Sequence, residues 1–275
     1  MKREASPSIG VVGAGRLGTS LAAALTAAGY RAAAIADRDG EAGQTIVRDC
    51  EVVFLTVPDV QIAPVCAALP WRAGQWAVHC SGALGIDVLA PAARAGSATG
   101  CLHPIQSFPS RQPEPERFRG IVCGVEASGE LGSFLERLAH DLGATTVRLE
   151  GVDRALYHAA AVFASNAVVA LAAAAERTWA LAGLPPETAH AALSPLLLGA
   201  ASNVAALGTV AALTGPVARG DVATVEGHLR ALAADPALLD LYRRLGAELL
   251  ALPLGLPEDA RRRLAALFDA RGNRQ

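Results

Sequence analysis

The sequence is poor in aromatic residues and carries little net charge. Aromatic residues make up 4% of its 275 residues, and 24 basic residues nearly balance 26 acidic ones, for a net charge of −2. This balance gives no electrostatic basis for binding nucleic acid or an anionic membrane. No basic and then apolar signal segment precedes the first apolar run, so we expect a cytoplasmic protein.

Cysteines are also few, and their arrangement argues against two kinds of cross-linked domain. Their number is odd, and none forms a CxxC pair. A disulfide framework needs paired cysteines, and a zinc site needs characteristic ligand spacing. We therefore expect no metal site and buried, free thiols at Cys50, Cys66, Cys80, Cys101 and Cys123.

Residues 155–175 form an apolar run that is long enough to cross a bilayer. The run is mostly alanine, and His158, Ser165 and Asn166 interrupt it. A helix that is apolar all round can also lie at the centre of a soluble domain. The sequence therefore predicts a buried helix here and no membrane span.

Strand-like and helical segments alternate through the first half of the chain. This alternation predicts a mostly parallel, doubly wound sheet with helices on both faces. Near residue 150 the pattern changes, and only helical segments follow. We therefore predict an α/β domain over residues 1–150 and an all-α domain over residues 151–275. The predicted strands are residues 8–12, 31–36, 51–57, 76–80, 97–102 and 121–125, and the main predicted helices are residues 16–28, 132–142, 153–182, 186–207, 222–234, 236–252 and 257–270.

A glycine-rich GxGxxG motif directly follows the first predicted strand and opens the first helix. In that context the first glycine allows a tight turn, the second lets a pyrophosphate approach the backbone, and the third lets helix and strand pack closely. Free N–H groups at the helix start then bind the anion. The alternative is a glycine-rich turn without a ligand. The motif predicts a Rossmann domain that contacts its dinucleotide through Gly13, Ala14, Gly15, Arg16, Leu17 and Gly18.

The residue that reads the adenosine ribose is expected at the end of the second strand. Asp37 stands there, and a carboxylate accepts hydrogen bonds from a 2′-hydroxyl and repels a 2′-phosphate. Arg38 could instead stack on adenine or pair with a 2′-phosphate. We therefore predict NAD or NADP as the cofactor and favour NAD. Thr56, Val57 and Pro58 end the third strand and are predicted to line the nicotinamide ribose site.

Four further motifs carry a family resemblance: FLTVPD at residues 54–59, HCSGALG at 79–85, LHPIQSFP at 102–109 and LTGPVARGD at 213–221. With them the chain resembles an uncharacterised family of Rossmann-like proteins with a helical C-terminal domain of unassigned function. That family is related to the 6-phosphogluconate and β-hydroxyacid dehydrogenases, pyrroline-5-carboxylate reductase and prephenate dehydrogenase. The resemblance covers nearly the whole chain. It implies a nicotinamide-dependent oxidoreductase with an active site between the domains and a homodimer built through the helices, but it supplies no substrate.

Two residues at predicted strand ends are candidates for the chemistry. His103 precedes a proline and is similar to the catalytic histidine of the prephenate dehydrogenases; an imidazole is suited to proton transfer at neutral pH. Its alternative role is to cap a strand end. Ser81 could donate to a substrate oxygen or to the nicotinamide amide, or it could simply form a turn with Gly82.

Polar residues on the predicted long helix suggest a substrate contact. Asn166 lies two turns after His158, so a continuous helix would place both roughly on one face. Related dehydrogenases carry a lysine and an asparagine on this helix, but here Val162 stands four residues before Asn166 and the nearest cation is Arg154. This departure puts a family-type lysine acid in doubt. Asn166 would orient the substrate or bridge helices.

A polar turn between apolar helices contains Thr214, Arg219 and Asp221. Arg219 could bind a carboxylate or phosphate through two hydrogen bonds, with Thr214 beside it. Alternatively, Arg219 and Asp221 cap helix ends or pair with each other. The sequence as a whole predicts an NAD(P)-dependent oxidoreductase acting on a small polar, anionic substrate. A non-catalytic dinucleotide-binding or sensory protein is the alternative.

Overall fold

The computed structural model describes residues 7–36 and 40–269, with the backbone alone for residues 32–36. The chain forms two compact units, Met1–Ser165 and Asn166–Gln275. The first unit contains the sheet and one helix beyond it, α6 (Arg154–Ala164). Sequence patterns place the domain boundary at residue 150, where the strands end. The division between the two compact units falls later in the sequence, after α6.

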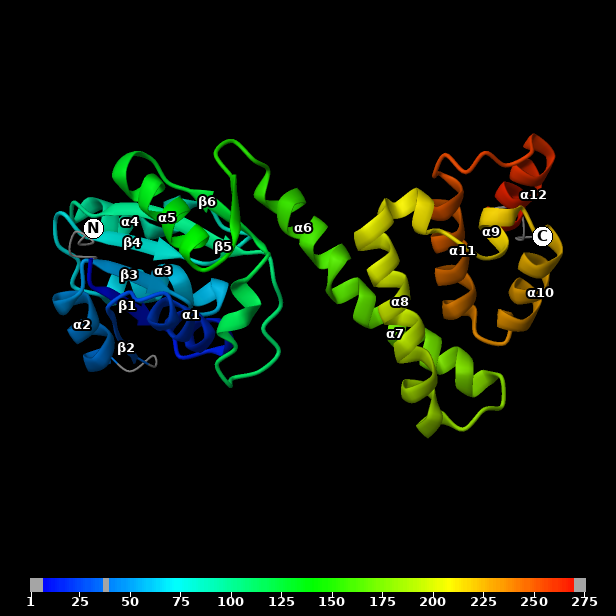
Figure 1. Cartoon of the computed structure of the whole chain (residues 1–275), viewed down its shortest axis with the longest axis horizontal. Coiled ribbons are helices and arrows are strands. Elements are labelled where there is room, and N and C mark those ends of the chain that lie inside the picture. Colours follow the sequence, from blue (N-terminus) through cyan, green and yellow to red (C-terminus); the bar gives the residue numbers. More distant parts are fainter. Residues whose placement is uncertain (1–6, 37–39, 270–275) are drawn as a thin grey trace. The chain divides into compact units, whose positions relative to one another are not determined.

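The first unit is built on a seven-stranded sheet in the order β2-β1-β3-β4-β5-β6-β7 (Figure 1). Neighbouring strands from β2 to β5 pair in parallel, and β6 is antiparallel to β5. The mostly parallel sheet predicted from the alternation of segments is thus confirmed. The strands are β1 (Ile9–Val12), β2 (Ala32–Ala36), β3 (Val52–Leu55), β4 (Trp76–His79), β5 (Ala98–Pro104), β6 (Val122–Glu126) and β7 (Thr145–Arg148).

Strand β7 was not predicted, and its position explains why. It is the last strand of the sheet, and all four of its residues, Thr145–Arg148, are exposed. An exposed edge strand needs no apolar face, so the sequence lacks the alternation that marks the other strands. The antiparallel direction of β6 has a separate cause. Parallel neighbours need a crossover connection, usually an α-helix, and only a short 3₁₀ turn (Pro115–Phe118) lies between β5 and β6.

Helices cover both faces of the sheet and form two apolar cores. On one face Leu21 and Leu25 of α1 pack with Phe54 and with Leu135 of α5. On the other face α2, α3 and α4 pack against alternate strand residues such as Val53. All five cysteines lie in the described ranges and are buried and free, as predicted. The helices are α1 (Arg16–Ala27), α2 (Gly40–Asp49), α3 (Asp59–Ala68), α4 (Ala90–Arg94) and α5 (Gly129–Asp141).

The second unit is entirely helical across its described residues, as the sequence predicted. Its own core is formed by α9 to α12, with Val225, Leu264 and Phe268 among the buried side chains. Asp221 and Asp235 cap α10 and α11 through hydrogen bonds from backbone N–H groups. The helices are α7 (Asn166–Leu181), α8 (Pro186–Ala212), α9 (Pro216–Arg219), α10 (Val222–Leu232), α11 (Pro236–Leu250) and α12 (Glu258–Phe268).

The single long helix predicted over residues 153–182 is wrong, because it is interrupted at Ser165. Ser165 has φ −127° and ψ −74°, and α6 ends before it. Its hydroxyl donates to the carbonyl of Ala161 at 2.7 Å, and such backward bonds from serine bend helices. His158 and Asn166 therefore stand on different helices, and the continuous helix on which the prediction of a shared face depended is not formed.

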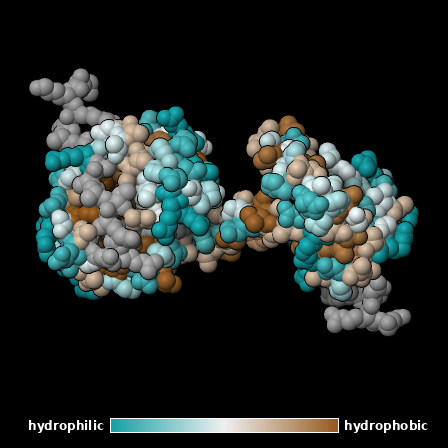
Figure 2. Space-filling view, turned by 90° about the horizontal axis from the view of Figure 1, so that it is seen from below, coloured by the Kyte–Doolittle hydropathy of each residue, from teal (hydrophilic) through white to brown (hydrophobic). Residues whose placement is uncertain are grey.

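The predicted burial of residues 155–175 is also wrong for the single chain. Neither α6 nor α7, both within the described residues, contains a buried residue. By length and composition, Arg154–Leu181 and Pro186–Arg219 are apolar enough to cross a membrane, but two such stretches are weak evidence for one. Figure 2 shows apolar residues, in brown, exposed among polar ones.

Candidate functional site

The turn between β1 and α1 has the geometry of a dinucleotide cradle. Gly13 has φ +118°, and a Cβ there would lie 2.8 Å from the backbone carbonyl carbon of Thr56. A Cβ on Gly18 would lie 1.9 Å from the carbonyl oxygen of Gly13. Both positions thus exclude any side chain, as the motif requires. The Thr56 hydroxyl donates to that same carbonyl at 2.7 Å and holds the turn against β3.

Gly15 differs from the other two glycines because the space in front of it is open. Among the described residues, the atom nearest to a Cβ placed on Gly15 is 3.9 Å away. Gly15 is also the N-cap of α1, and no described side chain caps that helix end. Free N–H groups of a helix start attract anions. Asp37 and Arg38, the predicted ribose contacts, lie outside the described residues.

Ser81 lies just after β4 and is fully occupied by hydrogen bonds. Its hydroxyl donates to the Asp59 carboxylate at 2.8 Å and accepts from the backbone N–H groups of Ala83 and Leu84. A hydroxyl has one hydrogen to donate, so in this arrangement Ser81 shapes the turn that follows β4. Its role as a substrate donor stays a prediction.

His79 is a fully buried histidine at the end of β4. It is 0% exposed, and its Nδ1 accepts a hydrogen bond from the Ser81 N–H at 3.1 Å. Burial, followed by the nearby Arg154 charge, lowers the pKa of His79 to about 4. The ring is therefore neutral at pH 7, and its hydrogen bond from Ser81 gives it a structural role in the turn after β4.

Acid should destabilise the fold through His79. The pKa of His79 is about 4 in the folded state, below the ordinary value of ~6.5. The stability that the neutral His79 ring contributes is therefore complete above pH ~6.5 and is lost as the pH falls toward 4. We expect the free energy of unfolding to fall by about 2 kcal/mol between pH 7.5 and pH 5 from this group. Urea unfolding at both pH values measures it. His79→Gln should reduce the fall, and His140→Gln on the surface of α5 should not; an equal fall in both variants would contradict the assignment.

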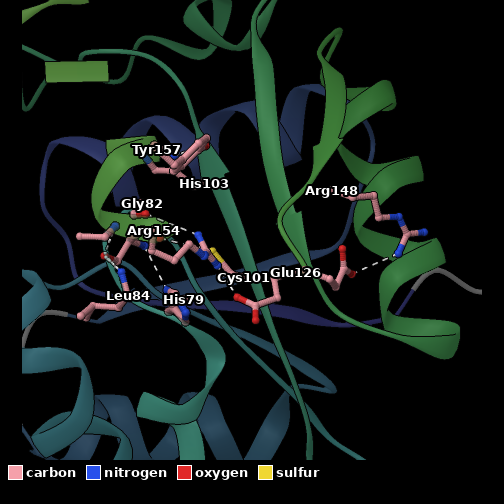
Figure 3. A network of polar contacts seen from close by, with 12 residues as sticks. His79, Gly82, Leu84, Cys101, His103, Glu126, Arg148, Arg154 and Tyr157 are labelled. Atoms are coloured by element: carbon pink, nitrogen blue, oxygen red, sulfur yellow. Dashed lines mark hydrogen bonds and ion pairs between the residues drawn. The ribbon is translucent and has the colours of Figure 1, made fainter. Parts of the chain in front are cut away.

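His103 lies near the end of β5 and meets a tyrosine from α6. Its Nδ1 is 2.7 Å from the Tyr157 hydroxyl, and the two rings meet edge to face with centroids 5.5 Å apart (Figure 3). The His158 ring is 6.4 Å from the His103 ring. Burial, then the His158 and Arg154 charges, lower the pKa of His103 to about 4. Burial raises the pKa of Tyr157 to about 12, so both groups are neutral at pH 7.

Helix α6 brings these side chains to the sheet because of its spacing and its start. Asp153 caps the helix by accepting from the N–H of Leu156 at 3.0 Å. Arg154, Tyr157 and His158 follow at positions i, i+3 and i+4, which share one face of a helix. The helix therefore presents a cation, a phenol and an imidazole together.

Arg154 fastens α6 to the ends of two strands. Its guanidinium forms an ion pair with Glu126 on β6, and only 11% of its side chain is exposed. It also donates to the carbonyl of Gly82 at 3.5 Å (Figure 3). Since its charge is already paired, Arg154 serves to hold α6 in register rather than to bind an anionic substrate.

Three predicted substrate contacts belong to the second unit. Asn166 is the first residue of α7, and Thr214 and Arg219 are exposed near the short helix α9. Asp221 accepts from the N–H and hydroxyl of Thr224 and so caps α10, one of the two roles predicted for it. The substrate-binding roles of Asn166, Thr214 and Arg219 stay predictions.

Sequence reasoning missed three features of this site: Tyr157, Glu126 and the role of Arg154 in joining α6 to the sheet. The signal for Tyr157 was its place beside His158 and three residues after Arg154, on the same helix face. The pairing of Arg154 with Glu126 had no local signal, because the two residues are brought together by the contact of α6 with β6.

Comparison with known families agrees with this geometry. Residues 2–104 match the model of a Rossmann-like domain, and residues 121–249 match that of a domain of unknown function, DUF2520. The chain thus combines a Rossmann-like domain with a DUF2520 domain. The family resemblance inferred from the sequence is thereby confirmed. No curated protein matches the sequence significantly.

Solved structures share the fold over most of the chain. A Bacteroides fragilis protein classed provisionally as an NADP oxidoreductase is 25% identical, with a TM-score of 0.68 over 89% of this chain and 98% of its own. A Thermotoga maritima protein is 28% identical, with a TM-score of 0.68 over 88% and 96%. A reductive aminase from Aspergillus terreus, solved with NADPH and ethyl-5-oxohexanoate, is 14% identical, with a TM-score of 0.61 over 88% and 94%. At 14% identity the likeness to the aminase shows the fold alone.

Proposed function

We propose that the chain is a nicotinamide-dinucleotide-dependent oxidoreductase acting on a small polar substrate. The observation that carries the proposal is the cradle, in which two glycines admit no side chain while the third faces open space at an uncapped helix start. A pyrophosphate at that place would be held by backbone N–H groups. The NADPH of the reductive aminase and the provisional NADP assignment of the B. fragilis protein support the same cofactor class.

We further propose His103 as the group that exchanges a proton with the substrate. Within the described residues Nε2 makes no hydrogen bond, whereas Nδ1 is engaged by Tyr157. When bound, the nicotinamide would supply or accept the hydride. The chain's part is to polarise the reacting C–O or C–N group and to move its proton. The carboxylate of Asp37 would favour NAD over NADP. An anionic substrate would bind to the guanidinium of Arg219.

Binding and turnover test this function separately. Titration with NADH and NADPH, followed by nicotinamide fluorescence, should show saturable binding of at least one of them. Turnover should then appear within a panel of 2-hydroxy acids, 3-hydroxy acids and cyclic imines. Binding without turnover of any panel member would support the non-catalytic, sensory alternative. No binding at millimolar dinucleotide would overturn both.

We also propose that the chain is a soluble cytoplasmic homodimer whose second copy covers α7 and α8. Val169, Leu196 and Leu198 on these helices are 71%, 71% and 67% exposed. Exposed apolar side chains gathered on neighbouring helices mark a surface that contacts another protein or a membrane. The acidic and basic residues are nearly balanced in number, which removes the charge attraction that an anionic membrane surface would need.

The dimer has a direct test in solution. Light scattering should give twice the mass of one chain, and the double variant Leu196→Glu, Leu198→Glu should give a single chain. Val60→Glu is the matched control, because Val60 is 80% exposed but belongs to the first unit. A monomeric wild type would refute the dimer. Sedimentation with membranes would refute the soluble location.

A further inference from the structure

We propose that Tyr157 is the positioning residue of His103. Its hydroxyl donates to Nδ1 and so keeps the ring proton on Nε2, and it passes its own proton to Nδ1 when Nε2 gives its proton to the product. The inference rests on the proposed oxidoreductase function for its last step only. The contact that carries it is the 2.7 Å distance between the Tyr157 hydroxyl and Nδ1 of His103.

The direction of this hydrogen bond follows from the chemistry of its two partners. A phenol is a better donor than a neutral imidazole N–H, and an imidazole nitrogen is a better acceptor than a phenol oxygen. Among the described residues, Nδ1 of His103 is the hydrogen-bond acceptor available to the Tyr157 hydroxyl. The bond made by one ring nitrogen decides which tautomer is present. Donation from Tyr157 therefore leaves the proton on Nε2.

Two glycines, one in the turn after β4 and one on β6, make room for the pair. A Cβ on Gly82 would lie 2.7 Å from Nε2 of His103, so the imidazole rests directly against the backbone after β4. A Cβ on Gly124 would lie 2.5 Å from the Tyr157 hydroxyl, and Gly124 pairs with His103 across β5 and β6. Any larger residue at either position would move one ring away from the other. The close approach is thus set by the backbone of β6 and of the turn after β4, and not by one flexible side chain.

The arrangement provides a balanced proton path. Hydride addition to a C=O or C=N carbon moves the electron pair of the double bond to the oxygen or nitrogen. That atom takes the proton from Nε2 of His103, and Nδ1 takes the phenolic proton of Tyr157. The products are the alcohol or amine, a neutral imidazole with its proton on Nδ1, and a phenolate that water reprotonates. Without the second transfer the ring would become an imidazolate, a much stronger base than a phenolate.

The charges around His103 agree with a neutral ring. Burial is the largest cause of the low pKa of His103. The charges of His158 and Arg154 on α6 lower that pKa further, Asp59 of α3 raises it, and the resulting pKa is about 4. Glu126 of β6 is paired with Arg154. A neutral ring holds one proton, so a second group must supply the next one. Tyr157, with its pKa raised to about 12, holds that proton at pH 7.

Nitrogen NMR of the full-length protein tests the tautomer without any substrate. In protein labelled with ¹⁵N at histidine, the His103 signals, assigned by their loss in His103→Gln, should show the Nε2–H tautomer at pH 7. In Tyr157→Phe the two tautomers should mix. The His103 pKa should also rise by roughly half to one unit, because the neutral form loses its hydrogen bond. With a substrate from the panel, kcat should fall roughly 10-fold or more while dinucleotide affinity is unchanged.

The second unit supplies a matched control. The Tyr242 hydroxyl is 2.8 Å from Nδ1 of His228, so Tyr242→Phe removes the same kind of bond at another place. It should alter the signals of His228 and leave those of His103 unchanged. An Nδ1–H tautomer in the wild type, or unchanged His103 signals in a folded Tyr157→Phe, would overturn the proposal. Failure of the protein to bind dinucleotide would count against the proposed function alone, since the NMR result does not depend on it.

Discussion

Gly15→Ala is expected to weaken dinucleotide binding strongly while leaving the fold intact. The added methyl group would meet no described atom within 3.9 Å, so the apoprotein can accommodate it. It would, however, occupy the space in which a pyrophosphate approaches the N–H groups at the start of α1. Each lost hydrogen bond to a charged group costs about 10- to 100-fold in affinity. Fluorescence titration with NADH and NADPH measures the change, and the urea midpoint should stay within error of the wild type.

Gly18→Ala is the matched variant and should behave in the opposite way. Its methyl group would lie 1.9 Å from the Gly13 carbonyl oxygen and 2.5 Å from the Thr56 hydroxyl. Since α1 cannot stay packed against β1 with such contacts, we expect a stability loss of roughly 1–3 kcal/mol or more. Equal affinity of wild type and Gly15→Ala for both dinucleotides would show that the turn is not a cofactor site.

His103→Ala is expected to lower kcat by about 100- to 10,000-fold, the range that general acid–base catalysis contributes. Its Nε2 is unoccupied by the described residues, whereas its Nδ1 is held by Tyr157. Affinity for the dinucleotide should not change, because the cradle lies on β1 and α1, and two strands, β3 and β4, separate β1 from β5 in the sheet. Steady-state kinetics on the panel substrate, together with the fluorescence titration, separates the two quantities.

His140→Ala is the control for this experiment, since His140 is exposed near the end of α5. Replacement there should leave both kcat and affinity unchanged. If His103→Ala keeps the wild-type kcat, the catalytic assignment of His103 is wrong, and its place near the end of β5 is structural. A loss of dinucleotide affinity in His103→Ala would instead indicate a general disturbance of the first unit.

Local sequence determined much of this protein. The GxGxxG motif after an apolar strand required the turn that the structure contains, because Gly13 and Gly18 have no space for a side chain. Six of the strands, and the helices α8, α10, α11 and α12 of the second unit, followed from apolar periodicity and from glycine and proline breaks. His103 could be selected as a candidate because it follows a strand and precedes a proline. These features depend on residues close together in the chain.

Only the tertiary structure decided the partners of the candidate residues. Tyr157 meets His103 across 54 positions of sequence, and Arg154 meets Glu126 across 28. Ser81 gives its hydrogen to Asp59, which no local pattern could show. The interruption at Ser165 also escaped prediction, because a serine bonded to its preceding turn reads as helical in sequence. Hydrogen bonds and ion pairs act over a few ångströms of space, so the fold that brings distant segments together determines them.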